Sequence, residues 1–326
     1  MRNEQTRRQF LGRGMTAAVG TASVGALARR GSAEGTAQPS DERSSAPNKN
    51  AYNRQAGAHL KLSCCAYSFN KFLPRGKKAG KMTMEDFVDL CAKLNLEGTE
   101  LTSYYFPPNA DTAYFRRIRR RAFLNGLEVS GTAVGNTFTL PPGKVRNEKV
   151  ASVKHWIDRA TEFAAPTIRI FAGSKPPTVT IEQARKWFVE CMEQCLPLAE
   201  KRGVFLALEN HGGIVTTAEQ TLACLSAIKS DWFGLNLDTG NFRDPDPYAA
   251  ITKCAPYSVN VHVKTHVHST TTKKSQPADY DRIAKILASA GYRGYVSLEY
   301  EARADAHAAV PKHIKALRSA IDETKA

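Results

Sequence analysis

Residues 203–213 read GVFLALENHGG, and this stretch decides the fold. Its apolar run, residues 204–208, stops abruptly at Glu209, Asn210 and His211, and two glycines follow. A strand in a parallel sheet is covered on both faces, so it is apolar throughout and turns polar only where it leaves the core. The stretch therefore predicts a buried parallel strand that carries polar side chains at its carboxyl end.

Three later stretches repeat this form. FGLNLDTGN (residues 233–241) contains Asp238, VNVHVKTH (259–266) contains His262 and Lys264, and YVSLEYEA (295–302) contains Glu299. Other apolar runs precede these four. Together they predict eight strands, at about residues 62–67, 98–102, 127–133, 167–172, 204–209, 233–238, 259–264 and 295–299.

Amphipathic segments separate the strands, and several begin with residues that cap helices. Thr83 precedes two acidic residues, and TIEQ (180–183) and TAEQ (217–220) match the capping box. The predicted helices cover about residues 83–94, 112–125, 147–163, 180–201, 217 onward, 247–254, 280–290 and 305 to the end. Eight strand–helix units over roughly 265 residues have the size and order of a (β/α)8 TIM barrel, an α/β fold. A doubly wound fold would carry a glycine-rich dinucleotide turn after its first strand, and that turn is missing from this sequence.

Residue parity predicts which strand side chains face the interior of the barrel. Residues two apart on a strand point the same way. Each of the four candidates shares its side with a small or polar residue two positions away, as Glu209 does with Ala207. The alternate positions are bulky and apolar, as expected for residues that face the helices: Leu208, Leu237, Val263 and Leu298.

Four inward-facing residues predict a metal site at the carboxyl ends of the last four strands, where barrel enzymes place their active sites. They are Glu209, Asp238, His262 and Glu299. Three carboxylates and one imidazole suit one divalent ion, with Mn²⁺, Mg²⁺ or Co²⁺ favoured and Zn²⁺ an alternative. The competing interpretation is that each residue is a hydrogen-bonded polar group at a strand end.

Other polar residues near strand ends are candidates for contact with a substrate. Glu100 ends the second strand in GTELTSYYF (98–106), Tyr104 follows it with an aromatic face suited to a sugar ring, and Asn136 lies in the third loop. His266 and His268 continue the parity of His262, so either could replace it as a ligand if that strand is longer than predicted.

The strand-end motifs ALENHGG, LNLDTGNF, NVHVKT and VSLEYE resemble those of the sugar phosphate isomerase/epimerase family, whose members have xylose isomerase-like TIM barrels. The resemblance covers residues from about 60 to the carboxyl terminus. It implies that Glu209, Asp238, His262 and Glu299 bind the metal and that Glu209 and Glu299 also act as the acid/base pair. It further implies that His211 and Lys264 contact substrate hydroxyls.

The resemblance implies proton abstraction alpha to a carbonyl through an enediolate, as in sugar isomerases and epimerases. A lyase or dehydratase acting on a keto-sugar, keto-glycoside or inosose would use the same residues. A non-catalytic sugar-binding barrel and a nuclease similar to endonuclease IV are weaker alternatives. Endonuclease IV carries a histidine shortly after the strand-six aspartate, whereas Thr239, Gly240 and Asn241 follow Asp238 in this chain.

The amino terminus resembles a twin-arginine (Tat) secretion signal. TRRQFL (residues 6–11) precedes a mildly apolar segment at 15–27, and ALA at 26–28 is a small-x-small cleavage site. The segment is too short and too weakly apolar for a membrane span. We therefore expect a signal peptide at residues 1–28, a disordered linker at 29–58, and the barrel at 59–326. The Tat export machinery becomes an expected partner, and the location is periplasmic or secreted.

Charge and cysteine content bear on the remaining questions of nucleic-acid binding and disulfides. The chain has 326 residues and a formal charge of +15, with its densest basic run at RRIRRR (116–121). No aromatic residues for base stacking interrupt this run, so it predicts a solvated helix face and no nucleic-acid partner. Seven cysteines are an odd number for a complete disulfide framework, and most lie in apolar patterns that predict structural burial. The sequence leaves the oligomeric state open.

Overall fold

The computed structural model describes residues 51, 52, 54–76 and 78–325. All of them belong to one compact unit, Ala46–Ala326. The predicted signal peptide and most of the predicted linker lie outside the described residues.

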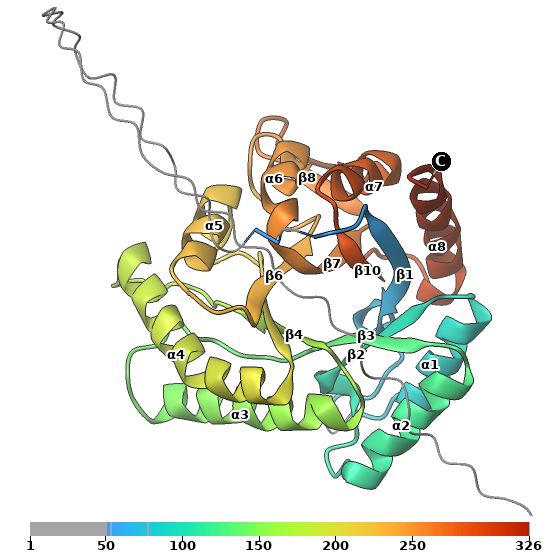
Figure 1. Cartoon of the computed structure of the whole chain (residues 1–326), viewed down its shortest axis with the longest axis horizontal. Helices are drawn as coiled ribbons and strands as arrows, with labels where there is room; N and C mark the ends of the chain where they lie inside the picture. The colour runs from blue at the N-terminus through green and yellow to red at the C-terminus, as the bar shows by residue number, and fades with distance from the viewer. Residues whose placement is uncertain (1–50, 53, 77, 326) are drawn as a thin grey trace, which may run out of the picture. The chain divides into compact units, whose positions relative to one another are not determined.

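Eight parallel strands close into a barrel, and the helices that follow them lie outside it (Figure 1). The closed order is β1-β2-β3-β4-β5-β6-β7-β10. This arrangement confirms the predicted (β/α)8 barrel. The strands are β1 (His59–Cys65), β2 (Gly98–Thr102), β3 (Glu128–Ala133), β4 (Thr167–Phe171), β5 (Phe205–Glu209), β6 (Phe233–Asp238), β7 (Ser258–Lys264) and β10 (Arg293–Glu299).

The helices agree closely with the predicted segments, although α3 starts slightly earlier. They are α1 (Met84–Lys93), α2 (Thr112–Leu124), α3 (Lys144–Glu162), α4 (Ile181–Arg202), α5 (Ala218–Ser226), α6 (Pro247–Cys254), α7 (Tyr280–Ser289) and α8 (Ala306–Glu323). Short 3-10 helices occupy η1 (Ala66–Phe69), η2 (Ser103–Tyr105) and η3 (Ala255–Tyr257). None of the described helices is long and apolar enough to cross a membrane.

The caps explain where several of these helices begin and end. Thr217 forms the predicted capping box with Gln220, whereas Thr180 accepts a bond from the Gln183 backbone without the reciprocal bond among the described residues. Gly203 ends α4 in the left-handed region, with φ of 67°. Glycine adopts this conformation without steric cost, and the chain can then turn directly into β5.

A two-stranded antiparallel hairpin, β8 (His266–Ser269) with β9 (Lys274–Pro277), follows β7 and was not predicted. β7 ends at Lys264, and Thr265 separates it from the hairpin. His266 and His268 therefore do not continue the interior face of β7, and the longer strand that would have made either one a ligand is not formed.

Two predictions made from composition, the burial of the cysteines and the solvated basic helix face, agree with the described structure. All seven cysteines are free and buried. Along the basic run of α2, Ile118 faces the core while Arg116, Arg117, Arg119 and Arg120 are exposed, as a solvated helix face requires.

Two residues on the amino-terminal side of the predicted boundary contact the base of the barrel. The Tyr52 backbone N–H donates to Pro256 O at 3.0 Å, and its hydroxyl donates to Phe233 O at 3.0 Å, where β6 begins. Arg54 donates to Ser258 O at 2.6 Å, where β7 begins, and its guanidinium lies 5.3 Å from the ring centre of Tyr292. These contacts attach Tyr52 and Arg54 to the barrel floor.

A chain that begins at residue 59 should therefore unfold at a lower temperature than one that begins at residue 51. Four hydrogen bonds of about 1 kcal/mol each would be lost, those of Tyr52 and Arg54 and the bond from Arg293 to Gly57 O. This loss corresponds to about 8–16 °C for a domain of this size. Differential scanning calorimetry of the two chains measures the change. Equal melting temperatures would contradict the anchoring role of Tyr52 and Arg54.

Candidate functional site

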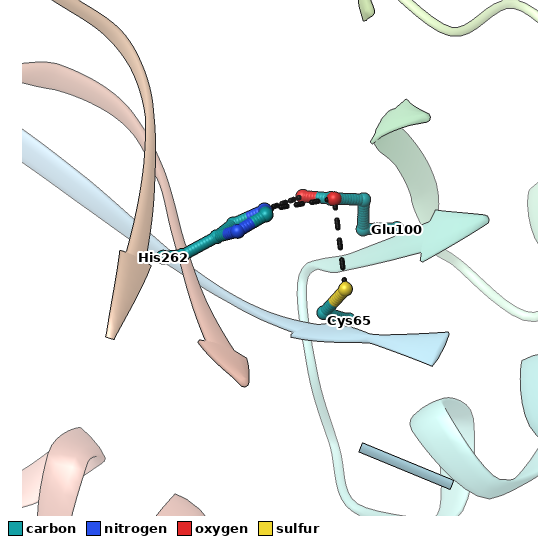
Figure 2. Close-up of side chains that lie close together, drawn as sticks. All are labelled: Cys65, Glu100 and His262. Carbon is teal, nitrogen blue, oxygen red and sulfur yellow. Dashed lines mark hydrogen bonds and ion pairs between the residues drawn. The ribbon is translucent and has the colours of Figure 1, made fainter. Parts of the chain in front are cut away.

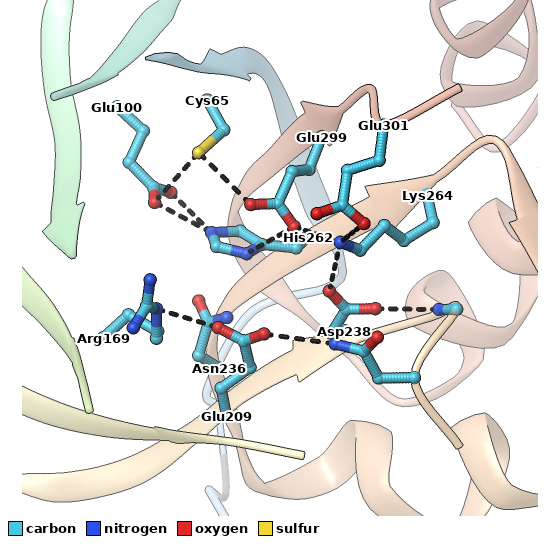
Figure 3. A network of polar contacts seen from close by, with 12 residues as sticks. Cys65, Glu100, Arg169, Glu209, Asn236, Asp238, His262, Lys264, Glu299 and Glu301 are labelled. Atoms are coloured by element: carbon cyan, nitrogen blue, oxygen red, sulfur yellow. Dashed lines mark hydrogen bonds and ion pairs between the residues drawn. The ribbon is translucent and has the colours of Figure 1, made fainter. Parts of the chain in front are cut away.

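The four candidate ligands lie together at the carboxyl ends of four neighbouring strands (Figure 3). Asp238 and Ser297 both pair in register with His262, and Glu299 pairs with Lys264. Ligand atoms of Glu209, Asp238 and His262 lie within 4.8 Å of one another. A Glu299 oxygen lies 3.7 Å from His262 Nδ1. All four side chains are buried, so the structure brings the predicted set into one interior cluster.

His262 is oriented by Glu100. Glu100 was predicted as a substrate contact, and the structure buries it fully beside His262. The His262 Nε2 lies 2.8 and 2.9 Å from the two Glu100 carboxylate oxygens (Figure 2). His262 Nδ1 is buried and, among the described residues, has no hydrogen-bond partner. With the ring proton on Nε2, Nδ1 presents its lone pair toward Glu299 and Asp238. This carboxylate–histidine pair is the arrangement that orients histidine ligands in metal sites.

Asp238 directs one carboxylate oxygen into the cluster, toward Lys264. Its Oδ1 accepts the Gly240 backbone N–H at 2.9 Å, while Oδ2 is buried and accepts no hydrogen bond from the described residues. Asn210 fixes the backbone of this residue by two 2.8 Å bonds, one to Asp238 O and one from Asp238 N. Strand parity places Asn210 on the outer side, and it does not predict this strand-to-strand clamp.

Glu209 is held from two sides, and the more important partner was missed in the sequence. Arg169 Nε lies 2.8 Å from Glu209 Oε2, and Asn241 donates to Oε1 at 3.1 Å. The Arg169 guanidinium also donates to Val134 O and lies 3.7 Å from the ring centre of Phe171. The sequence does contain a signal for Arg169: TIRIF (residues 167–171) has an arginine in the middle of a strand that is otherwise mostly apolar.

Lys264 connects the two remaining carboxylates. Its Nζ lies 2.6 Å from Glu299 Oε2 and 3.5 Å from Asp238 Oδ2. It also pairs with Glu301, a residue at the rim that the sequence pattern does not single out. The predicted substrate contact at Lys264 thus lies inside the cluster, within reach of anything bound between Asp238 and Glu299.

The cluster contains more acidic groups than basic ones, so it can accept a cation. Four carboxylates, on Glu100, Glu209, Asp238 and Glu299, face three cationic groups, on Arg169, His262 and Lys264. Burial lowers the pKa of His262, but the charges of Glu100, Glu299 and Glu209 and the hydrogen bond to Glu100 together outweigh it and raise that pKa to about 10. Burial raises the pKa of Asp238 to about 8 against the opposing effect of Lys264. A divalent ion in place of the His262 proton would balance the cluster, so the residues present fit such an ion.

A second group of potential ligands, Cys65, Glu100 and His262, uses the opposite edge of the same imidazole (Figure 2). Its nitrogen, Nε2, is already hydrogen-bonded to Glu100. Burial also raises the pKa of the Cys65 thiol well above its usual value. His262 Nδ1 and Asp238 Oδ2, which form no hydrogen bond with the described residues, both belong to the other side, which is therefore the better candidate metal centre.

The other three predicted substrate contacts, Tyr104, His211 and Asn136, lie at different positions relative to the cluster and have different partners. The Tyr104 hydroxyl accepts a bond from Arg169 at 3.1 Å, so this ring stands beside the cluster. His211 is exposed, and its ring lies 4.6 Å from that of Phe171, outside the four candidate ligands. The Asn136 amide both donates to and accepts from the Phe171 backbone. It therefore joins β4 to the loop after β3.

A cavity of about 470 Å³ opens next to Lys264. The loop after β6, the β8–β9 hairpin and the segment after β10 form its walls. A larger cavity of about 730 Å³ lies between residues of α6 and α7, and none of the candidate site residues lines it. The smaller cavity is therefore the one connected to the cluster.

Comparison with known proteins identifies the family. Residues 88–320 match the family described as xylose isomerase-like TIM barrel, and the chain belongs to that family. No curated protein sequence matches the chain.

Solved structures share the fold at low sequence identity. An L-ribulose 3-epimerase superposes with a TM-score of 0.66 at 17% identity, over 82% of this chain and 96% of the other. A D-psicose 3-epimerase from Clostridium cellulolyticum H10, solved with D-tagatose, gives 0.64 at 16% identity, over 81% and 98%. A probable 3-DHS dehydratase from Bacillus anthracis gives 0.59 at 17% identity, over 80% and 98%.

Replacing Glu100 with glutamine should weaken metal binding although Glu100 is not among the candidate ligands. Loss of the carboxylate removes the charge that orients the His262 ring, and changes of this kind cost about 10–100-fold in metal affinity. Titration calorimetry with Mn²⁺ measures the dissociation constant. Glu193→Gln, an exposed residue on α4, is the matched control. An unchanged dissociation constant in folded Glu100→Gln protein would remove Glu100 from the site.

Proposed function

We propose that this protein is a metal-dependent sugar isomerase or epimerase that removes a proton alpha to a carbonyl. One observation carries the proposal: Glu209 and Glu299, each held by its own cation, lie on either side of the His262–Asp238 pair (Figure 3). Two carboxylates in this arrangement can exchange protons with the two faces of one carbon. Membership in the xylose isomerase-like family and the epimerase neighbours support the same chemistry.

The proposed metal ligands are Glu209, Asp238, His262 and Glu299, with Mn²⁺, Mg²⁺ or Co²⁺ favoured and Zn²⁺ as the alternative. A divalent ion bound there would polarise the substrate carbonyl and stabilise the negative charge of the enediolate. The neighbouring residues prepare the ligands for this task. Glu100 holds the His262 ring, and Asn210 holds the Asp238 backbone.

Glu209 and Glu299 are the proposed acid/base pair. One group, as a carboxylate, accepts the proton alpha to the carbonyl, and the other, as a protonated carboxylic acid, returns a proton from the opposite face. Return to the same carbon gives an epimer, whereas return to the neighbouring carbon interconverts aldose and ketose. Arg169 orients the Glu209 carboxyl group, and Lys264 orients that of Glu299. Lys264, Tyr104 and His211 are the proposed contacts to substrate hydroxyls.

A lyase or dehydratase is the second candidate. Lys264 lies 2.6 Å from Glu299, so a lysine proton donor is available beside this proposed acid/base residue to protonate a departing group. One structural neighbour is a probable dehydratase. This reaction begins with the same proton abstraction and differs only in the fate of the enediolate, which expels the leaving group instead of regaining a proton.

Proton exchange with solvent distinguishes the two reactions. The Mn²⁺-loaded protein is incubated in D₂O with a panel of ketopentoses and ketohexoses, and products are followed by NMR. We expect deuterium beside the carbonyl with no group lost. Glu209→Gln and Glu299→Gln should each slow the exchange by at least about 10²-fold, while Glu193→Gln should not.

An unsaturated product would replace the epimerase proposal with the lyase. Absence of exchange with every sugar would support a barrel that binds sugars without catalysis. Exchange that survives both glutamine variants would assign the proton transfers to other residues.

We also propose export by the Tat pathway to the periplasm or the medium. The proposal is supported by the arginine pair and the mildly apolar segment after it. Lysine at positions 7 and 8 retains the charge but removes the guanidinium pair, and should keep the protein in the cytoplasm. Cell fractionation in a bacterium with the Tat machinery measures this. Arg2→Lys with Arg13→Lys is the matched control, and equal export of both variants would contradict the proposal.

A further inference from the structure

The cavity beside Lys264 has a strongly basic lining. Its charged and titratable residues are Arg243, Lys264, His266, His268, Glu301 and Arg303. Glu301 is the single carboxylate among them, and it is paired with Lys264. The two arginines therefore have no acidic counterpart within the cavity.

Arg243 is held in position by the loop that also touches the reacting cluster. Its Nη1 donates to Gly240 O at 3.2 Å and to Phe242 O at 3.0 Å. Its backbone N–H donates to Thr216 O at 2.9 Å. Within the described chain, the remaining guanidinium donors have no partner. The same loop carries Asn241, which donates to Glu209. Arg243 therefore belongs to the same loop as the residue that contacts Glu209, one of the proposed acid/base pair.

Arg303 and His268 line the other two walls of the cavity, formed by the segment after β10 and by the β8–β9 hairpin. Arg303 is exposed on the segment after β10, two residues beyond Glu301. His268 lies on β8 and is half-buried. Neither side chain forms a hydrogen bond or ion pair with any described residue. Arginine side chains without partners around a cavity attract anions and raise their local concentration.

We infer that the substrate carries an anionic group, a carboxylate or a phosphate, which Arg243 and Arg303 bind in this cavity while its hydroxylated chain reaches Lys264 and the candidate metal ligands. The inference rests on the proposed function, because it names the class of sugar that this site accepts. Planar guanidinium groups match carboxylate and phosphate oxygens in pairs of charge-assisted hydrogen bonds. Arg243, already fixed by two carbonyl groups, loses little freedom when it binds such a group.

Polyols without a carbonyl group test the inference separately from catalysis. Titration calorimetry on the Mn²⁺-loaded protein compares sorbitol with gluconate and sorbitol 6-phosphate. We expect at least one anionic polyol to bind at least about tenfold more tightly than sorbitol. The preference should shrink as NaCl is added, because salt screens exposed charges.

Substitutions then locate the anion. Arg243→Gln and Arg303→Gln should each reduce the preference for the anionic polyol about tenfold, and Arg243→Lys should retain part of it. Arg116→Gln removes the same charge from the outer face of α2, so the preference should persist in this control. A preference for gluconate alone identifies a sugar acid, and one for sorbitol 6-phosphate alone identifies a sugar phosphate.

Three results would overturn the inference: no binding of any polyol, equal binding of sorbitol and both anions, or a preference that survives both glutamine substitutions. The last result would assign the anion to the metal centre. Failure of this inference can be distinguished from failure of the proposed function. Deuterium exchange with neutral ketoses and no anion preference would refute the inference alone. Anion binding through both arginines without exchange on any sugar would refute the isomerase proposal alone.

Discussion

Four carboxylates are buried at one end of the barrel, and the neighbouring structure serves to make that concentration of negative charge stable. Buried charges that lack partners are costly, so each acid has a designated cation or donor. Arg169 serves Glu209, Lys264 serves Glu299 and Asp238, and His262 serves Glu100. Three cationic groups serve four carboxyl groups, and His262 Nδ1 and Asp238 Oδ2, which form no hydrogen bond with the described residues, lie where a further cation would bind.

Side-chain clamps hold the strand ends that carry these residues. Asn136 joins the loop after β3 to Phe171 on β4, and Asn210 joins the end of β5 to Asp238 on β6. Thr239 accepts the Lys264 backbone N–H, and Ser68 accepts that of Tyr300. Each clamp continues the strand pairing beyond the last regular bond. The site is therefore held by backbone as well as by side chains, which is the support that a constellation of ligands requires.

The barrel and its four candidate ligands could be predicted because they depend on local patterns. Apolar runs that end in polar residues locate the strands, and parity alone directs Glu209 and His262 inward. The contact of Glu100 with His262 could not be predicted in this way, since the two residues are 162 positions apart in the sequence. Asn136 has the pattern of a loop residue facing a pocket, and only the fold reveals its bond to Phe171. The β8–β9 hairpin was missed because its short strands carry no apolar run.

The proposed chemistry requires one divalent ion bound on the Nδ1 side of His262. A crystal structure of the Mn²⁺-loaded protein, with data collected at a wavelength where manganese scatters anomalously, measures its position directly. We expect a single anomalous peak within about 2.0–2.4 Å of oxygens of Glu209, Asp238 and Glu299 and of His262 Nδ1, with Glu100 still bonded to Nε2. A peak among Cys65, Glu100 and His262 Nε2, or no peak in the barrel at saturating Mn²⁺, would contradict it.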